Sequence, residues 1–260
     1  MEAHTLHTKQ TLIANIKALG IQPDDLVTCH ISLKAVGPID AGHSTGADVM
    51  LDALRECVSD GLLMVPTHTF HLFENKPTEP PTFDIRNTMP CIGAVPTVAV
   101  KRANDAYDRG DKTILRSWKP THSVVVFGQK AEEYIREDAM APVSTPSFGC
   151  LAKLPKLGGK ILLIGVDLRR NTFIHYLDDL MSPAPYRPFC TKMVHYDGTE
   201  ELRVSASTKG SSMTYQDRYG KLLDEGGALS YGKIGDADVI VCDARKTMKL
   251  IVGAWDELNP

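Results

Sequence analysis

The sequence predicts one α/β domain with a mostly parallel central sheet flanked by helices, an added antiparallel hairpin and long loops. Short apolar runs at residues 26–30 and 62–66 alternate with stretches of helical spacing at 8–19 and 45–58. Alternating strands and helices with short turns between them are typical of a parallel sheet. Of the 260 residues, 43% are hydrophobic, which is enough for a sizeable core. We therefore treat residues 1–260 as a single domain.

Each element has a local signal. In the first helix, Leu12, Ile16 and Leu19 recur at helical spacing, and Gly20 closes it. The proline-rich stretch at about 74–90 is incompatible with regular structure and is predicted to be a long loop insertion. In chain order we expect helices at 8–19, 45–58, 92–103, 131–135, 172–180 and 215–223, strands at 26–30, 62–66, 123–127, 161–166 and 239–242, and a hairpin of 193–196 with 202–205.

Composition excludes several classes of protein. The net charge of −3 disfavours a nucleic-acid binder. Because no apolar run approaches about 20 residues and the N-terminus lacks a signal pattern, we expect a cytoplasmic protein without membrane contact. The six cysteines lack paired spacing, so we expect reduced thiols. His68 and His71 have no second ligand pair at a zinc-site spacing, so no metal is expected. Oligomeric state is not predicted.

Residues 42–46 read G-x-S-x-G, the pattern of a serine hydrolase nucleophile. That chemistry requires a sharp turn from a strand into a helix. The residues before Ser44 are a poor strand, and Thr45 with Asp48 fits a helix cap better. A hydrolase using Ser44 with His175 or His122 stays as an alternative.

Three segments carry polar residues at the ends of predicted strands. Open α/β sheets bind their ligands at such strand ends. The turn at 30–34 offers backbone N–H groups to a phosphate or a thioester carbonyl, although an unoccupied turn explains it equally well. The loop at 116–123 combines cations, hydroxyls and a tryptophan face, and arginine suits phosphate contacts. The third segment runs from Asp167 to Asp179.

His175 is the candidate general base in this third segment. Asn171 or Thr172 is expected to cap the helix, which places His175 in its first turn. Asp178 and Asp179 follow three and four residues later, on nearly the same face. A carboxylate near an imidazole fixes its tautomer and raises its basicity.

These segments, in this order, resemble the antibiotic N-acetyltransferase family, the aminoglycoside 3-N-acetyltransferases. The resemblance runs from the first helix to near the C-terminus. Its landmarks are the segments 19–33 (with an HSSL-like stretch at 30–33), 65–69, 116–123, 144–146, 162–166, 171–176 and 232–237.

The resemblance implies direct transfer of an acetyl group from acetyl-CoA to an amine, with aminoglycoside N3-acetylation and antibiotic resistance as the family's activity. His175 would be the base, and Asp178 and Thr69 would assist. The residues that would hold acetyl-CoA are His30, Ile31, Ser32, Leu33, Lys34, Arg116, Ser117, Thr121, His122 and Ser123. The residues that would face the acceptor are Glu74, Asp84, Asn171 and Asp179, with Glu79 as a further candidate acid.

Two positions depart from the family pattern. Lys119 stands where the family usually has histidine, and the segment around Thr208 and Lys209 lacks an expected acid. That acid helps to orient the base or to bind a cationic acceptor. The acceptor is therefore an aminoglycoside or another amine, and a CoA-binding protein that has lost catalysis stays as a third hypothesis.

Overall fold

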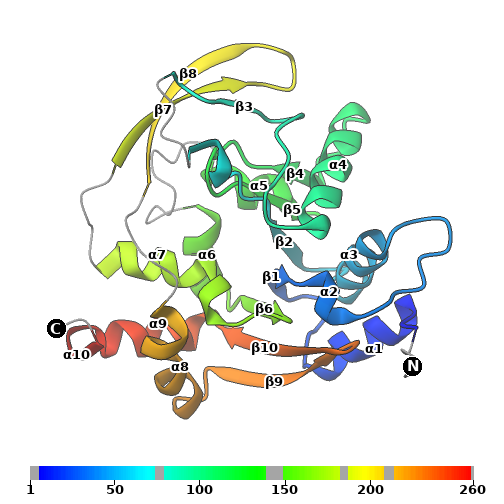
Figure 1. Ribbon diagram of the computed structural model, residues 1–260, viewed down its shortest axis with the longest axis vertical. Coiled ribbons are helices and arrows are strands. Elements are labelled where there is room, and N and C mark those ends of the chain that lie inside the picture. The colour runs from blue at the N-terminus through cyan, green and yellow to red at the C-terminus, as the bar shows by residue number, and fades with distance from the viewer. Residues whose placement is uncertain (1–5, 74–78, 139–148, 182–186, 208–213, 259–260) are drawn as a thin grey trace.

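The computed structural model describes residues 6–73, 79–138, 149–181, 187–207 and 214–258. Its main feature is a seven-stranded sheet in the order β4-β5-β2-β1-β6-β10-β9, with a smaller sheet β3-β7-β8 (Figure 1). The strands are β1 (Leu26–Ile31), β2 (Leu62–Pro66), β3 (Thr82–Asp84), β4 (Ile114–Arg116), β5 (Val124–Phe127), β6 (Lys160–Ile164), β7 (Arg187–Val194), β8 (Glu200–Ser207), β9 (Leu229–Ile234) and β10 (Ala237–Asp243). The helices are α1 (Lys9–Ala18), α2 (Leu33–Val36), α3 (Gly46–Cys57), α4 (Ala94–Asp108), α5 (Ala131–Ile135), α6 (Cys150–Lys156), α7 (Thr172–Met181), α8 (Tyr215–Glu225), α9 (Ala244–Gly253) and α10 (Trp255–Leu258), with 3-10 turns η1 (Phe70–Phe73) and η3 (Leu168–Arg170).

The predicted α/β class and the added hairpin are confirmed. Strand β1 pairs in parallel with both β2 and β6. The outer pairings, β2 with β5, β5 with β4, β6 with β10 and β10 with β9, are antiparallel. Within the large sheet, parallel pairing is therefore limited to the three central strands, so the sheet is mixed and not mostly parallel as predicted.

Helices cover both faces of the large sheet because its strands are apolar on both sides. Leu63 and Val65 of β2 pack into a core with α1, α3 and α4, whereas Leu62 and Met64 pack into a second core with α5 to α9 (Figure 1). Alternate residues of a strand point to opposite faces, so a continuous apolar run is what a strand buried on both sides requires.

Side-chain caps fix the helix starts that the sequence predicts. Thr8 and Thr11 form a reciprocal capping box at the start of α1. The Thr45 hydroxyl accepts a hydrogen bond from the Asp48 backbone at 3.2 Å, which starts α3. These caps satisfy N–H groups that have no partner within the helix.

Several expectations need correction. The strand expected at 161–166 ends at Ile164, because Gly165 turns the chain with φ +65°, a conformation that favours glycine. A Cβ at Gly165 would also overlap Ala35. The predicted loop at 74–90 contains β3, which pairs in parallel with β7, while residues 74–78 lie outside the described part. Strands β4 and β9 and helices α6 and α9 are not among the expected elements, although α9 buries Ala244, Thr247 and Ile251 at helical spacing.

The small sheet is attached to the large one through aromatic packing. Phe83, Ile85 and Met193 form its buried cluster, against which Trp118 packs. Trp118 follows β4 directly, and its ring centroid lies 4.0 Å from that of His195. The hairpin is thereby tied to the edge of the large sheet where β4 ends. In the described ranges, no helix combines the length and the apolarity needed to cross a membrane.

Candidate active site

A cleft of about 720 Å³ opens at one edge of the large sheet. The parallel strands β1, β2 and β6 end at this edge, and β5 starts there because it runs antiparallel to β2. Segments distant in sequence therefore meet, as the strand-end rule for open sheets predicts. The lining residues are Cys29, His30, Ile31, Ser32, Val65, Pro66, His68, Phe70, Phe73, Cys91, Ile92, Val95, Pro96, Thr121, His122, Val166, Arg169, Arg170, Thr172 and His175.

Four histidines form a row along the cleft. Ring centroids are 6.3 Å apart for His30 and His68, 4.7 Å for His68 and His122, and 6.2 Å for His122 and His175. Burial, with repulsion from His175 and nearby cations, lowers the pKa of His30 to about 4 and that of His122 to about 3. Burial also lowers the pKa of His68 well below its usual value. The row is therefore neutral at pH 7.

His175 is oriented by a series of hydrogen bonds through a tyrosine to an aspartate. Its Nδ1 lies 2.7 Å from the Tyr215 hydroxyl, which donates to Asp178 Oδ2 at 2.7 Å. The Tyr219 hydroxyl donates to Asp178 Oδ1 at 2.9 Å. Asp178 therefore lies near His175, as the helical spacing predicts, but its hydrogen bond to the imidazole passes through Tyr215.

This chain determines which imidazole nitrogen carries the proton. A phenol has one proton, and the Asp178 carboxylate can only accept a hydrogen bond. If Tyr215 donates to Asp178, its oxygen accepts from Nδ1–H of His175. Nε2 is then the unprotonated nitrogen, and it makes no hydrogen bond to any residue in the described ranges. Burial lowers the pKa of His175 and Asp178 raises it, with burial the larger effect, so the ring is a neutral base at pH 7.

Five of the residues expected to hold acetyl-CoA line the cleft: His30, Ile31, Ser32, Thr121 and His122. The Ser32 backbone N–H is already bonded to the Ile164 carbonyl. Leu33 and Lys34 lie outside the lining but begin α2, so their N–H groups have no acceptor within that helix. Ser123 and Ser117 are fully buried, with hydroxyls bonded to the Thr67 carbonyl and the Val124 N–H respectively.

Arg116 does not reach the cleft, contrary to the expected phosphate contact. It is 3% exposed, and its guanidinium donates to the carbonyls of Ile85 and Thr88 and lies over the Phe83 ring. Through these two hydrogen bonds Arg116 stabilises the loop around β3. Thr69 is likewise buried, and its hydroxyl donates to the Pro120 carbonyl, so it joins two loops and lines no part of the cleft.

The residues expected to face the acceptor are not gathered at the cleft. The Asp84 carboxylate accepts from the backbone of Arg86 and Asn87, which stabilises a turn. Asn171 is fully buried and caps α7 by accepting from the Phe173 N–H at 3.1 Å. Glu79 is exposed outside the cleft lining. Glu74 and the side chain of Asp179 lie outside the described part of the chain, as does Thr208.

A buried ion pair lies beneath the histidines. Lys119 Nζ is 3.0 Å from Asp138 Oδ1, and the two side chains are 5% and 1% exposed. A small pocket beside them is also lined by Thr28, His68 and His122. Lys119, which departs from the family pattern, is thus an internal cation with a matched partner rather than a side chain presented to a ligand.

Ser44 has the surroundings of a loop residue. Its hydroxyl donates to the Ala41 carbonyl at 2.9 Å, it is exposed, and it is absent from the cleft lining. Thr45 caps the following helix, as the sequence indicates. In the part of the chain that the structure describes, the Ser44 hydroxyl makes no hydrogen bond to a histidine.

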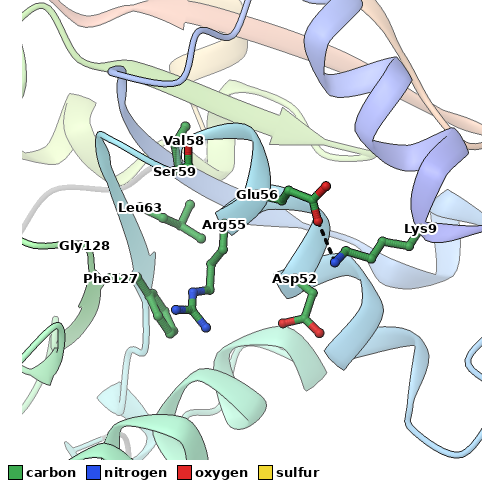
Figure 2. Close-up of a pocket in the computed structure, with 9 residues that line it drawn as sticks. All are labelled: Lys9, Asp52, Arg55, Glu56, Val58, Ser59, Leu63, Phe127 and Gly128. Carbon is green, nitrogen blue, oxygen red and sulfur yellow. Dashed lines mark ion pairs between the residues drawn. The ribbon is translucent and has the colours of Figure 1, made fainter. Parts of the chain in front are cut away.

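A second hollow, of about 410 Å³, lies at the opposite edge, where β2 begins (Figure 2). Its charged side chains are occupied: Lys9 pairs with Glu56 at 2.7 Å, and Asp52 pairs with Arg102. The Arg55 guanidinium lies over the Phe127 ring at 5.1 Å. The hollow contains no imidazole or thiol in its lining, so the cleft is the candidate active site.

Sequence reasoning missed several residues of the site. Tyr215 and Tyr219 lie 40 and 44 positions after His175, and no local pattern connects them with it. His68 and Asp138 are likewise brought to the site only by strand order. Within the described ranges, no group of three His, Cys, Asp or Glu side chains has a geometry that could hold a metal ion.

Comparison with known proteins identifies related sequences. Residues 28–255 match the family described as aminoglycoside 3-N-acetyltransferase. An aminoglycoside N(3)-acetyltransferase IV of Salmonella is 27% identical over 179 residues, covering 68% of this chain and 60% of the relative. An aminoglycoside N(3)-acetyltransferase III of Serratia marcescens is 28% identical, covering 69% and 66%. The chain thus spans less than two thirds of the length of these relatives.

Solved structures share the fold. The YokD protein of Bacillus subtilis aligns with a TM-score of 0.80 at 18% identity, covering 99% of this chain and 96% of that one. The aminoglycoside acetyltransferase AAC(3)-IVa apoenzyme aligns with a TM-score of 0.76 at 19% identity, covering 99% and 91%. AAC-IIIb in a binary complex with CoASH aligns with a TM-score of 0.77 at 22% identity, covering 97% of each chain.

Proposed function

Because the chain belongs to the aminoglycoside 3-N-acetyltransferase family, we propose that it transfers an acetyl group from acetyl-CoA to an amino group of an aminoglycoside or similar amine. For an aminoglycoside acceptor, the group that receives the acetyl is the 3-amino group of the 2-deoxystreptamine ring. The observation that carries the proposal is the chain of hydrogen bonds from Asp178 through Tyr215 to His175 at the cleft. Antibiotic resistance and a cytoplasmic location follow from the resemblance and the composition, and stay predictions.

The proposed chemistry is direct acyl transfer with His175 as general base. The amine nitrogen attacks the thioester carbonyl carbon while Nε2 of His175 takes a proton from it. A C–N bond forms, the C–S bond breaks, and the CoA thiolate leaves and takes up the proton that His175 received, which returns the imidazole to its neutral form. The imidazolium formed at His175 is stabilised by Asp178 through Tyr215. Direct transfer requires no protein nucleophile, which agrees with the position of Ser44.

The cleft lining combines apolar and polar side chains. Val65, Pro66, Phe70 and Ile92 give it an apolar strip along which the pantetheine arm would lie. Among the residues that the resemblance assigns to acetyl-CoA, Ile31, Ser32 and Thr121 line the cleft and are the candidate contacts to the donor. AAC-IIIb, which has this fold, forms a binary complex with CoASH.

The test is an acceptor panel in which release of the CoA thiol is followed. At least one amine should raise thiol release above the rate of acetyl-CoA hydrolysis. His175→Ala should abolish this release with little change in the Kd for CoA by calorimetry. The absence of both thiol release and CoA binding would refute the proposal. Full activity in His175→Ala would show that another group is the base. A fluorophosphonate probe that labels Ser44 would support the hydrolase alternative.

A further inference from the structure

The small pocket beside the Lys119–Asp138 pair adjoins the cleft at the row of histidines. His68 and His122 line both the pocket and the cleft. The ion pair and Thr28 of β1 contribute further walls of the pocket. Its volume is about 10 Å³, which is enough for about one water molecule.

Buried polar atoms without a partner belong to three of the residues that line this pocket. They are Thr28 Oγ1, His68 Nε2 and Asp138 Oδ2, and none of them forms a hydrogen bond within the part of the chain that the structure describes. The three residues are 2%, 6% and 1% exposed. Buried polar atoms are nearly always hydrogen-bonded, either to protein or to ordered water. Atoms from three separate segments therefore point to one shared partner.

The chemistry of these atoms selects a neutral ligand that both donates and accepts. The Asp138 oxygen only accepts, whereas the Thr28 hydroxyl can do either. Burial and the neighbouring histidines lower the pKa of His68 well below its usual value, so its ring is neutral and Nε2 either donates or accepts. A cationic ligand is disfavoured because Lys119 Nζ already lies 3.0 Å from Asp138. Water has the required two donors and two acceptors.

We propose that the pocket binds one water molecule, which donates to Asp138 Oδ2 and His68 Nε2 and accepts from the Thr28 hydroxyl. In this arrangement every O–H group has an acceptor. A proton on Nε2 of His68 would instead leave one O–H group of the water or of Thr28 without an acceptor, which is costly for a buried group. The water therefore places the proton of His68 on Nδ1.

The bound water connects the buried ion pair to the wall of the cleft. The ring centroid of His68 lies 4.7 Å from that of His122, which lies 6.2 Å from that of His175. Thr28 and Asp138 are thus positioning residues, since they act on the cleft through the water and His68. The water site goes beyond the proposed acetyl transfer and is tested without any acceptor, so the failure of one proposal leaves the other intact.

The first experiment is a crystal structure at a resolution that shows ordered water. We expect density for one water molecule within about 2.5–3.2 Å of Thr28 Oγ1, His68 Nε2 and Asp138 Oδ2. A dry pocket would overturn the proposal. A side chain from the segment 139–148 in contact with these atoms would overturn it as well.

The second experiment reads the tautomer of His68 from its imidazole ¹⁵N chemical shifts at pH 7, with His68→Asn used to assign the signals. The wild type should show a protonated Nδ1 and an unprotonated Nε2. Thr28→Ser keeps the hydroxyl and should keep this preference, whereas Thr28→Val removes the hydroxyl and should weaken it. A proton on Nε2 in the wild type, or an unchanged preference in Thr28→Val, would overturn the proposed arrangement.

Stability gives a third measurement with a matched control. Thr28→Val should raise the equilibrium constant for unfolding about fivefold, the effect of losing one buried hydrogen bond. In Thr247 the hydroxyl is also buried and has no partner in the described ranges, but Thr247 lines neither the cleft nor the pocket. Thr247→Val should therefore leave the constant unchanged or lower it. Equal effects of the two variants in urea titrations would contradict the hydrogen bond between Thr28 and the water.

Discussion

The Tyr215 hydroxyl lies 2.7 Å from His175 Nδ1 and donates its proton to Asp178 at 2.7 Å. Tyr215 is on α8, whereas His175 and Asp178 share α7, so the packing of α8 against the large sheet sets the tautomer of the candidate base. In this arrangement the Asp178 carboxylate orients the His175 imidazole through the Tyr215 phenol, which lies between the two groups.

Removal of the phenol oxygen should impair catalysis without affecting donor binding. Tyr215→Phe keeps the buried ring but leaves Nδ1–H of His175 without its acceptor. We expect kcat to fall about 10- to 100-fold, a part of the usual general-base contribution, at an unchanged Kd for CoA. Tyr219→Phe is the matched control: it removes the second hydrogen bond to Asp178, together with the contact of the Tyr219 hydroxyl with Arg218, and should cost less than about threefold. Equal losses in both variants would show that the hydroxyl of Tyr215 has no special role.

Asp178 should control the pH dependence of the reaction. Burial lowers the pKa of His175, and the Asp178 charge opposes that effect. Asp178→Asn removes the opposing charge, so the pKa of His175 should fall further. The acid limb of the kcat/KM profile should therefore move to lower pH, with a reduced plateau because Asn no longer stabilises the imidazolium. An acid limb that stays in place or moves to higher pH would contradict the assignment of His175 as the titrating base.

The buried histidines should make the protein sensitive to acid. The pKa values of His30, about 4, and His122, about 3, lie below the usual 6.5. Between pH 6.5 and these lower pKa values, the unfolded chain binds more protons than the folded protein does. The contribution of the neutral histidines to the free energy of unfolding is therefore complete above pH 6.5 and is lost as the pH falls toward 4. We expect urea unfolding to show a loss on the order of 3 kcal/mol for each of these two histidines across this window. His122→Asn should flatten the slope, because it removes one of the two buried imidazoles. An unchanged slope in His122→Asn would exclude this explanation.

The ion pair beneath the site should matter for stability. Lys119→Met leaves Asp138, which is 1% exposed, as an uncompensated buried charge. We expect a loss of about 3–5 kcal/mol in the free energy of unfolding. Lys112→Met is the matched control, because its pair with Glu132 is 71% and 55% exposed and contributes about 0–1 kcal/mol. Similar losses in the two variants, measured by urea titration at pH 7, would contradict this role for Lys119.

The sequence predicts the parts of the fold that local pattern determines. The buried runs of β1, β2 and β6 and the helices α1 and α3 lie where apolar spacing places them, and the predicted cap at Thr45 starts α3. His175 and Asp178 could be paired because helical spacing is a local rule. In contrast, β4 and β9 are short or half-exposed and carry no such pattern.

The rest of the site depends on tertiary structure. Arg116 is of a residue type that suits phosphate contacts, but the fold buries it under β3. No local signal in the sequence predicts this burial. Tyr215 reaches His175 because α8 returns to the same face of the sheet. From the sequence alone, Lys119 is expected to be a surface cation. The fold instead places Asp138 beside it as a buried partner.

The most direct measurement is the tautomer of His175, read from its two imidazole ¹⁵N chemical shifts at pH 7 in selectively labelled protein, with His175→Asn used to assign the signals. The structure predicts a protonated Nδ1 and an unprotonated Nε2 in the wild type, and loss of this preference in Tyr215→Phe. A proton on Nε2 in the wild type would contradict the proposal that this nitrogen accepts the proton from the amine.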